Sequence, residues 1–147
     1  MIRAAGAADL TAIDPFAPDF LKPAYKRGRF LQALRDGAVV VAVDGSTVAG
    51  FMWCNEFFGH TFVNVLAVAP DQRRRGHAGT LLAYAEEHAM TDRVFTSTNA
   101  SNATMHTVLK RYGWKRCGEI DDLDPGDPEI VYVKYPRRHV AGPGPLG

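Results

Sequence analysis

The chain has 147 residues, of which 46% are hydrophobic and 22% are charged. This composition is close to that of soluble globular domains, so it disfavours a disordered chain, and no apolar run is long enough to cross a bilayer. Seventeen Lys and Arg against sixteen Asp and Glu leave a net charge of +1, which gives no global field to hold nucleic acid or an anionic membrane. We expect one domain at residues 1–136 and a flexible, Pro- and Gly-containing tail at residues 137–147.

The two cysteines, Cys54 and Cys117, have no close partner in the sequence and no accompanying cluster of His residues. This pattern predicts free thiols in a reducing compartment, with neither a disulfide framework nor a zinc site. The start of the chain lacks the long apolar core of a secretory signal peptide. We therefore expect a cytoplasmic protein that holds no metal.

The first half of the chain predicts an alternation of short helices and strands. Phe30, Leu31 and Leu34 recur on one face of a helix that ends before Gly37. The strand that carries Asn64 is otherwise almost wholly apolar, which is typical of a strand buried on both faces. The predicted elements are a strand at 2–4, a helix at 7–13, a connection at 16–23 whose aromatics cover the core or line a pocket, a helix at 24–36, and strands at 39–43, 47–58 and 61–69.

In the second half, Leu81, Leu82 and Ala85 recur at helical spacing after a basic turn. The crossover through this helix is long enough to make the strand at 94–98 parallel to the strand at 61–69. A helix at 102–112 and a hairpin of strands at 114–120 and 129–135 follow. The expected fold is therefore α/β, with a mixed, mostly antiparallel sheet of about six or seven strands and helices on both faces.

The most informative stretch is VLAVAPDQRRRGHAGTLL at residues 65–82, where a strand, a basic turn and a helix are predicted to follow one another. Gly76 lets the backbone approach a ligand closely, and Ala78 leaves space beside it. The N–H groups of residues 74–79 have no earlier helical carbonyl to pair with. Such a turn directs N–H groups and the positive end of the helix dipole at one point, so it predicts a phosphate-bearing ligand.

Two motifs carry a resemblance to a known family. V-A-P at residues 68–70 is followed by R-R-R-G-H-A at residues 73–78. The chain resembles the GNAT superfamily of acyl-CoA-dependent N-acetyltransferases, which has Arg or Gln, two residues, Gly, one residue and Gly or Ala after a strand ending in Val-x-Pro. A second family pattern has an Asn, a small residue at +3, Tyr at +7 and Gly-Phe at +11 and +12; these places hold Asn102, Met105, Leu109, Gly113 and Trp114. The order of elements agrees over residues 2–135.

The resemblance implies that acetyl-CoA is the co-substrate and that a primary amine attacks it directly in a ternary complex. It places the pyrophosphate on the turn and the pantetheine arm between the splayed strands at 61–69 and 94–98. The backbone of the first strand would bind one side of the arm, and Asn102 would bind the other side. The donor-binding residues implied in this way are Leu66, Val68, Arg73, Arg74, Arg75, Gly76, His77, Ala78, Gly79 and Asn102.

The acceptor side departs from the family pattern, so the catalytic residues are unknown. Leu109 stands where the family's frequent general acid, a Tyr, is expected, and Asn64 stands where many relatives have a carboxylate. An amide takes up no proton at neutral pH, but it can orient a water or the substrate, which gives Asn64 a weak substrate-binding assignment. Glu56, on the preceding strand, is the nearest carboxylate candidate in the sequence and has the same weak assignment. Tyr112 is expected to be a core residue. His106, one turn after Asn102, could face the ligand, although a solvent-facing position is the stronger expectation.

Several alternatives remain open on the sequence alone. Asn102 could be only a helix N-cap. The acidic turn at 121–129 could attract a cationic acceptor or be a solvated hairpin tip; it lacks the spacing of a calcium loop. The acceptor is a small-molecule or peptide amine, no nucleic acid or membrane is expected as a partner, and a homodimer is compatible with the sequence. A regulatory or interaction module that binds CoA or acyl-CoA with little turnover is the alternative function.

Overall fold

The computed structural model describes residues 1–136, so the tail expected at residues 137–147 lies outside the described residues. The chain forms two compact units. The first unit comprises Met1–Cys54 and Val65–Leu82, and the second comprises Asn55–Asn64 and the chain from Ala83 onward. Two strands and one helix run from one unit into the other. The prediction of a single domain at 1–136 therefore stays a prediction.

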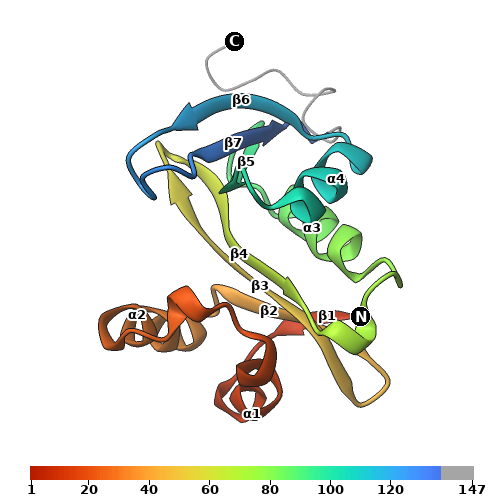
Figure 1. The fold of residues 1–147 in the computed structure, drawn as a ribbon. Coiled ribbons are helices and arrows are strands. Elements are labelled where there is room, and N and C mark those ends of the chain that lie inside the picture. The colour runs from red at the N-terminus through yellow and green to blue at the C-terminus, as the bar shows by residue number, and fades with distance from the viewer. Residues whose placement is uncertain (137–147) are drawn as a thin grey trace. The chain divides into compact units, whose positions relative to one another are not determined.

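Seven strands in the described part of the chain are hydrogen-bonded in the order β1-β2-β3-β4-β5-β7-β6 (Figure 1). The pairs β1–β2, β2–β3, β5–β7 and β6–β7 are antiparallel, and β4–β5 is parallel. The predicted mixed, mostly antiparallel sheet and its parallel pair are thus confirmed. The strands are β1 (Ile2–Ala4), β2 (Val39–Asp44), β3 (Thr47–Phe57), β4 (His60–Val68), β5 (Val94–Asn99), β6 (Lys115–Ile120) and β7 (Glu129–Lys134).

The helices also agree with the predicted positions. They are α1 (Leu10–Ile13), α2 (Ala24–Arg35), α3 (His77–Glu87) and α4 (Ala103–Arg111). Short 3-10 turns at Ala7–Asp9, Asp14–Phe16, Asp19–Leu21 and Pro70–Gln72 fill the connections. Gly37 ends α2 with φ +74, the left-handed conformation that glycine adopts without steric cost.

The core of the first unit lies between α2 and the strands β2 and β3. Phe30 and Phe51 are fully buried, with ring centroids 5.7 Å apart in an edge-on arrangement. Phe16 from the proline-punctuated connection also packs on Phe51, at 5.7 Å, whereas Phe20 is 48% exposed. One of the two aromatics of this connection therefore covers the core, as expected, and the other does not.

Helix α3 begins on the opposite side of the first unit's sheet from α2. Gly50 and Phe51 are consecutive in β3, so their side-chain positions face opposite sides of the sheet. An added Cβ at Gly50 would lie 3.4 Å from the Cδ1 atom of Leu81 and 2.8 Å from the carbonyl oxygen of Ala67. Glycine is therefore needed here for β4 and α3 to approach β3 this closely. Helices on both faces of the sheet are confirmed in this unit.

In the second unit, β5, β7 and β6 are covered by α4, whose Leu109 is fully buried. Lys134 on β7 donates to the carbonyl oxygen of Tyr112 at 2.6 Å, just after the end of α4. Lys134 also forms an ion pair with Glu86 at 3.3 Å. These contacts hold the C-terminal parts of α3 and α4 to β7.

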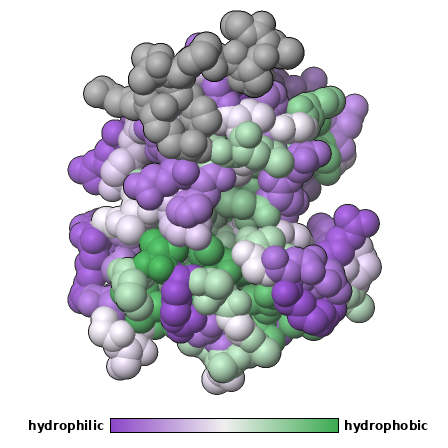
Figure 2. Space-filling model, turned by 180° about the vertical axis from the view of Figure 1, so that it is seen from behind, coloured by the Kyte–Doolittle hydropathy of each residue, from purple (hydrophilic) through white to green (hydrophobic). Residues whose placement is uncertain are grey.

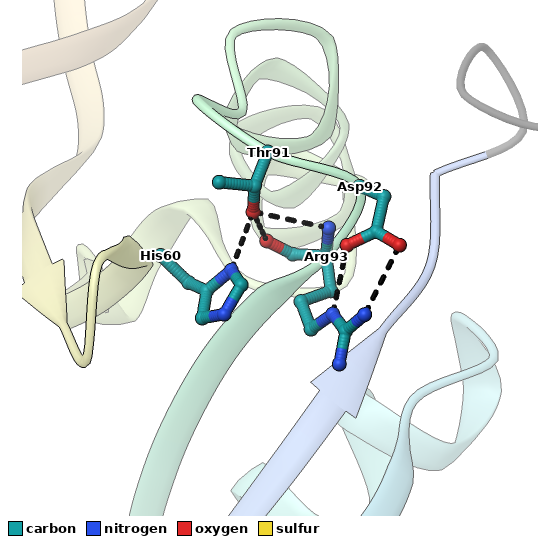
Figure 3. A network of polar contacts seen from close by, with 4 residues as sticks. All are labelled: His60, Thr91, Asp92 and Arg93. Atoms are coloured by element: carbon teal, nitrogen blue, oxygen red, sulfur yellow. Dashed lines mark hydrogen bonds and ion pairs between the residues drawn. The ribbon is translucent and has the colours of Figure 1, made fainter. Parts of the chain in front are cut away.

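The loop between α3 and β5 is held against the start of β4 by the hydroxyl of Thr91 (Figure 3). Thr91 donates to the carbonyl oxygen of Arg93 at 3.2 Å and accepts from its N–H at 3.4 Å. The Nδ1 atom of His60 lies 2.6 Å from the same hydroxyl, and this contact ties the loop to the start of β4. Arg93 in turn forms an ion pair with Asp92 at 2.8 Å (Figure 3).

Two details differ from the predicted strands. The strand at 61–69 was expected to be buried on both faces, but burial alternates: Thr61, Val63 and Val65 are buried, and Phe62 and Asn64 are half-buried. One face of this part of β4 is therefore only partly covered. The preceding strand was expected to extend to Phe58, but Phe58 and Gly59 form a two-residue turn with φ values of +50 and +80, which suits the twist of a tight hairpin.

Hydrophobic and hydrophilic residues are mixed on the face of the molecule seen in Figure 2, with several hydrophobic (green) side chains reaching the surface. Scattered apolar residues are normal on a protein surface. Within residues 1–136, no helix has both the length and the apolar character needed to cross a membrane.

Candidate functional site

The turn between β4 and α3 has a strained backbone. After the 3-10 turn Pro70–Gln72, Arg73 is extended, Arg74 has φ +64 and Gly76 has φ +83. A left-handed conformation is free for glycine but costs about 1–2 kcal/mol for a residue with a Cβ atom. Such strain gathers at ligand-binding positions, where surrounding structure maintains it. Arg74 was predicted as part of the turn, but its left-handed conformation was not.

The strained turn presents a row of backbone donors. The first hydrogen bond of α3 runs from the N–H of Thr80 to the carbonyl oxygen of Gly76, at 3.0 Å. Among the residues that the structure describes, none accepts a hydrogen bond from the N–H groups of residues 74–79. These groups lie at the positive end of the helix dipole. The backbone of the first unit therefore has the unpaired donors that the sequence predicts, and anion binding by them stays a prediction.

The three arginines of the turn are exposed. The Arg73 Nε atom lies 3.5 Å from the carbonyl oxygen of Val68, at the long limit of a hydrogen bond. Arg75 is 3.8 Å from a carboxylate oxygen of Asp44 and 3.4 Å from Gln72, and exposed contacts of this length contribute little to stability. The arginine side chains are thus free to reorient toward an anionic ligand.

His77, Ala78 and Gly79 form the first turn of α3 and are half-buried. The Nε2 atom of His77 is buried and has no hydrogen-bond partner among residues 1–136. A buried polar atom without a partner costs free energy. The first turn of α3 therefore has unpaired backbone donors, while the unpaired nitrogen of His77 is shielded from the surface in this structure.

Leu66 and Val68 lie near the end of β4 and are half-buried. The described ladder between β4 and β5 pairs Thr61–Val63 with Val94–Thr96. The backbone groups of Leu66 and Val68 take no part in that ladder. The first unit therefore brings together nine of the ten predicted donor-binding residues on one continuous strand, turn and helix.

The tenth residue, Asn102, lies in the second unit at the N-cap of α4. Its Oδ1 atom accepts a hydrogen bond from the N–H of Met105 at 3.2 Å. The N-cap interpretation is therefore correct, but it uses only the acceptor of the amide. In the described structure the two Nδ2 protons have no partner, so the cap fixes the amide and leaves its donors available.

The predicted acceptor-side residues also lie in the second unit. Asn64 on β4 is half-buried, and the described residues offer its side chain no hydrogen bond. Glu56 on β3 is exposed. The structure thus gives Asn64 no protein partner, which is compatible with contact to solvent or to a ligand, and it leaves the role of both residues a prediction.

Leu109 on α4, where the resemblance would place a Tyr as general acid, is apolar and fully buried. Tyr112 is half-buried, with its carbonyl oxygen bonded to Lys134. His106 corrects the expectation of a solvent-facing side chain. It is half-buried, and its Nδ1 atom lies 2.6 Å from the hydroxyl of Tyr132. The reason is that Tyr132, on β7, is brought beneath the first turn of α4.

The acidic turn between β6 and β7 is partly committed to structure. Asp127 accepts hydrogen bonds from the N–H and the hydroxyl of Ser101, at 3.0 and 2.6 Å. Asp124 accepts from the Nδ2 atom of Asn99 at 2.9 Å. The exposed Asp121 and Asp122 remain at the tip. The part of the chain that the structure describes contains no group of three or more His, Cys, Asp or Glu residues placed to hold a metal.

Comparison with known proteins identifies a family and a fold. Residues 8–114 match the family model described as Acetyltransferase (GNAT) family. A GNAT-family acetyltransferase from Bacillus cereus is 32% identical, with a TM-score of 0.82 and coverage of 92% of this chain and 96% of that chain. The ribosomal-protein-alanine N-acetyltransferase of Brucella melitensis is 22% identical (TM-score 0.70; coverage 92% and 99%) and shares the fold.

A third structure contains a ligand. It is a putative streptothricin acetyltransferase from Bacillus anthracis in complex with acetyl coenzyme A, 15% identical, with a TM-score of 0.60 and coverage of 66% of this chain and 61% of that chain. At this identity the similarity shows the fold alone. No curated protein sequence matches the chain significantly.

Proposed function

The chain belongs to the GNAT family of acetyltransferases, and we propose that it transfers the acetyl group of acetyl-CoA to a primary amine by direct attack in a ternary complex. The observation that carries this proposal is the row of unpaired N–H groups at residues 74–79. These donors, together with the left-handed Arg74 and Gly76, suit a pyrophosphate. The arginine side chains of the turn would add to its binding.

The remaining donor-binding assignments follow the same elements. The backbone of Leu66 and Val68 would bind the pantetheine arm, and the free Nδ2 donors of Asn102 would bind an amide carbonyl of that arm. Bound acetyl-CoA supplies an activated acetyl thioester, and a thiol is its leaving group. The chain's own residues then need to hold the reacting groups together and exclude water, and positioning of this kind can supply much of the rate.

The proton chemistry of the site is unusual for the family. An alkyl amine attacks in its neutral form, yet its ordinary pKa is about 10.4. Leu109 is buried and apolar, and Asn64 is an amide, so neither moves a proton. A thiolate leaving group has an ordinary pKa of about 8.5 and gains less from protonation. The rate is therefore expected to rise with pH, as the amine loses its proton.

The turn is tested by Gly76→Ala, with acetyl-CoA binding followed by isothermal titration calorimetry. An added Cβ meets nothing within 4 Å, so the substitution acts through the left-handed backbone alone. We expect about tenfold weaker binding. The alanine variant relaxes away from the left-handed conformation, and its return to that conformation on binding costs about 1–2 kcal/mol. Gly45→Ala is the matched control, since Gly45 also has φ +61 and open space. It should lower stability and leave affinity unchanged; equal affinities for both variants would contradict the assignment.

A module that binds acyl-CoA with little turnover is the second candidate, favoured by the buried Leu109 and by the amide at Asn64. Thiol release from acetyl-CoA, measured with a panel of small amines and peptide N-termini, separates the two functions. Release that depends on one class of amine supports the enzyme. Tight binding without release on any amine supports the module.

A further inference from the structure

Hydrogen bonds from two sides hold the junction between β5 and α4, residues 99–102. On one side, the N–H of Ala100 donates to the carbonyl oxygen of Pro128 at 2.8 Å, and Asp127 accepts two hydrogen bonds from Ser101. On the other side, His106 reaches back from the first turn of α4. Its Nε2 atom lies 3.0 Å from the carbonyl oxygen of Asn99 and 3.2 Å from that of Ala100.

The hydrogen bonds define the tautomer of His106. A carbonyl oxygen only accepts, so Nε2 carries the proton and donates it to the junction. In the neutral ring, Nδ1 is then an acceptor, and the Tyr132 hydroxyl, 2.6 Å away, donates to it. Tyr132 is only 2% exposed and lies opposite Thr96 in the β5–β7 ladder. A side chain anchored in the sheet therefore orients His106, and His106 holds the junction.

This chain of bonds ends at Asn102. The N–H of Asn102 donates to the carbonyl oxygen of Asn99 at 3.0 Å, the same oxygen that accepts from His106. The side chain of Asn102 caps α4 through Oδ1. The conformation of residues 99–102 therefore decides where the unused Nδ2 donors of Asn102 are placed. Backbone carbonyls are poor proton acceptors, so the Tyr132–His106 chain is suited to positioning and not to proton transfer.

We propose that His106 and Tyr132 are positioning residues of the donor site, which hold the β5–α4 junction so that the Asn102 amide can bind an amide carbonyl of the pantetheine arm. This inference rests on the proposed function and extends it to two residues that contact the ligand only through Asn102. It also accounts for a histidine turned inward in the first turn of α4.

The test is calorimetric titration of the full chain with acetyl-CoA, together with steady-state kinetics and thermal unfolding. Tyr132→Phe keeps the packed ring and removes the hydrogen bond to His106. We expect binding of acetyl-CoA to weaken by about three- to tenfold, through loss of one positioned hydrogen bond. The KM for acetyl-CoA should rise by the same factor, and kcat should change little. His106→Gln, whose amide can still donate to Asn99, should retain affinity within about twofold, whereas His106→Leu should lose it.

Thr91→Val is the matched control, because it removes a histidine–hydroxyl bond of the same length, 2.6 Å, in the same unit (Figure 3). It should lower the unfolding temperature at least as much as Tyr132→Phe and leave acetyl-CoA affinity unchanged. Equal affinities for wild type, Tyr132→Phe and Thr91→Val would overturn the inference while leaving the proposed function intact. A collapse of kcat at unchanged KM would also overturn it, because that result marks a catalytic residue. Failure of the wild-type chain to bind acetyl-CoA would instead refute the proposed function, and the inference with it.

Discussion

Gly50 sets how closely the end of β4 approaches β3, and Gly50→Ala tests that contact. The added Cβ would lie 2.8 Å from the carbonyl oxygen of Ala67, a distance that real Cβ contacts do not reach, and 3.4 Å from the Cα atom of Val68. The backbone of β4 or β3 must therefore shift. Overpacking of this kind lowers stability by about 1–3 kcal/mol. Alanine also lowers the conformational entropy of the unfolded chain, which offsets about 0.4–1 kcal/mol of this loss.

The expected net loss is therefore about 1–2 kcal/mol in the free energy of unfolding, or roughly 3–8 °C in Tm for a chain of this size. Urea unfolding followed by circular dichroism measures it, with an unchanged m-value showing that the surface exposed on unfolding is the same. Gly118→Ala is the control, because Gly118 is also in a strand and its added Cβ meets only Val131, at 4.0 Å. It should leave stability unchanged or raise it by up to about 1 kcal/mol, through the same loss of freedom in the unfolded chain. A Gly50→Ala variant as stable as Gly118→Ala would refute the close contact.

The remaining predictions concern the first unit and the two thiols. Gly28→Ala in α2, where an added Cβ meets nothing within 4 Å, should raise stability by about 0.5–1 kcal/mol in urea unfolding. Asp9 accepts two hydrogen bonds from Arg3, and these hold its pKa below the ordinary value. Its contribution is therefore present above about pH 4 and lost as pH falls further, so the stability difference between wild type and Asp9→Asn should shrink from pH 7 to pH 3. Burial raises the pKa of the half-buried Cys54 thiol to about 12. A thiol reagent at pH 8 should therefore modify the exposed Cys117 faster than Cys54. Equal rates in the native state would contradict this difference.

The sequence predicted the secondary structure well because its signals are local. Gly37, Gly45 and Gly113 mark turns where the structure has positive φ, and apolar periodicity located α2, α3 and α4. The strand–turn–helix was recognisable for the same reason, since its nine residues are continuous in the chain. Local pattern and local structure agree wherever a few neighbouring residues decide the conformation.

The rest of the site depends on long-range contacts that a single sequence does not show. His106 was expected to face solvent because nothing nearby in the chain indicates that Tyr132, 26 residues later, lies beneath it. The role of Asp127 in holding Ser101 is hidden in the same way within an acidic turn that resembles a solvated tip. The left-handed Arg74 was missed because an arginine carries no signal for positive φ.

The proposed function depends on the backbone N–H groups of residues 74–79, which we expect to bind the pyrophosphate of acetyl-CoA. Titration of the isotopically labelled chain with acetyl-CoA, followed by amide resonances in NMR spectra, tests it most directly. Saturable shifts are expected in the amide resonances of Arg74, Gly76 and Gly79, with that of Gly45 unchanged. Acetyl-CoA binding that leaves those three amides unperturbed, or no binding at all, would contradict it.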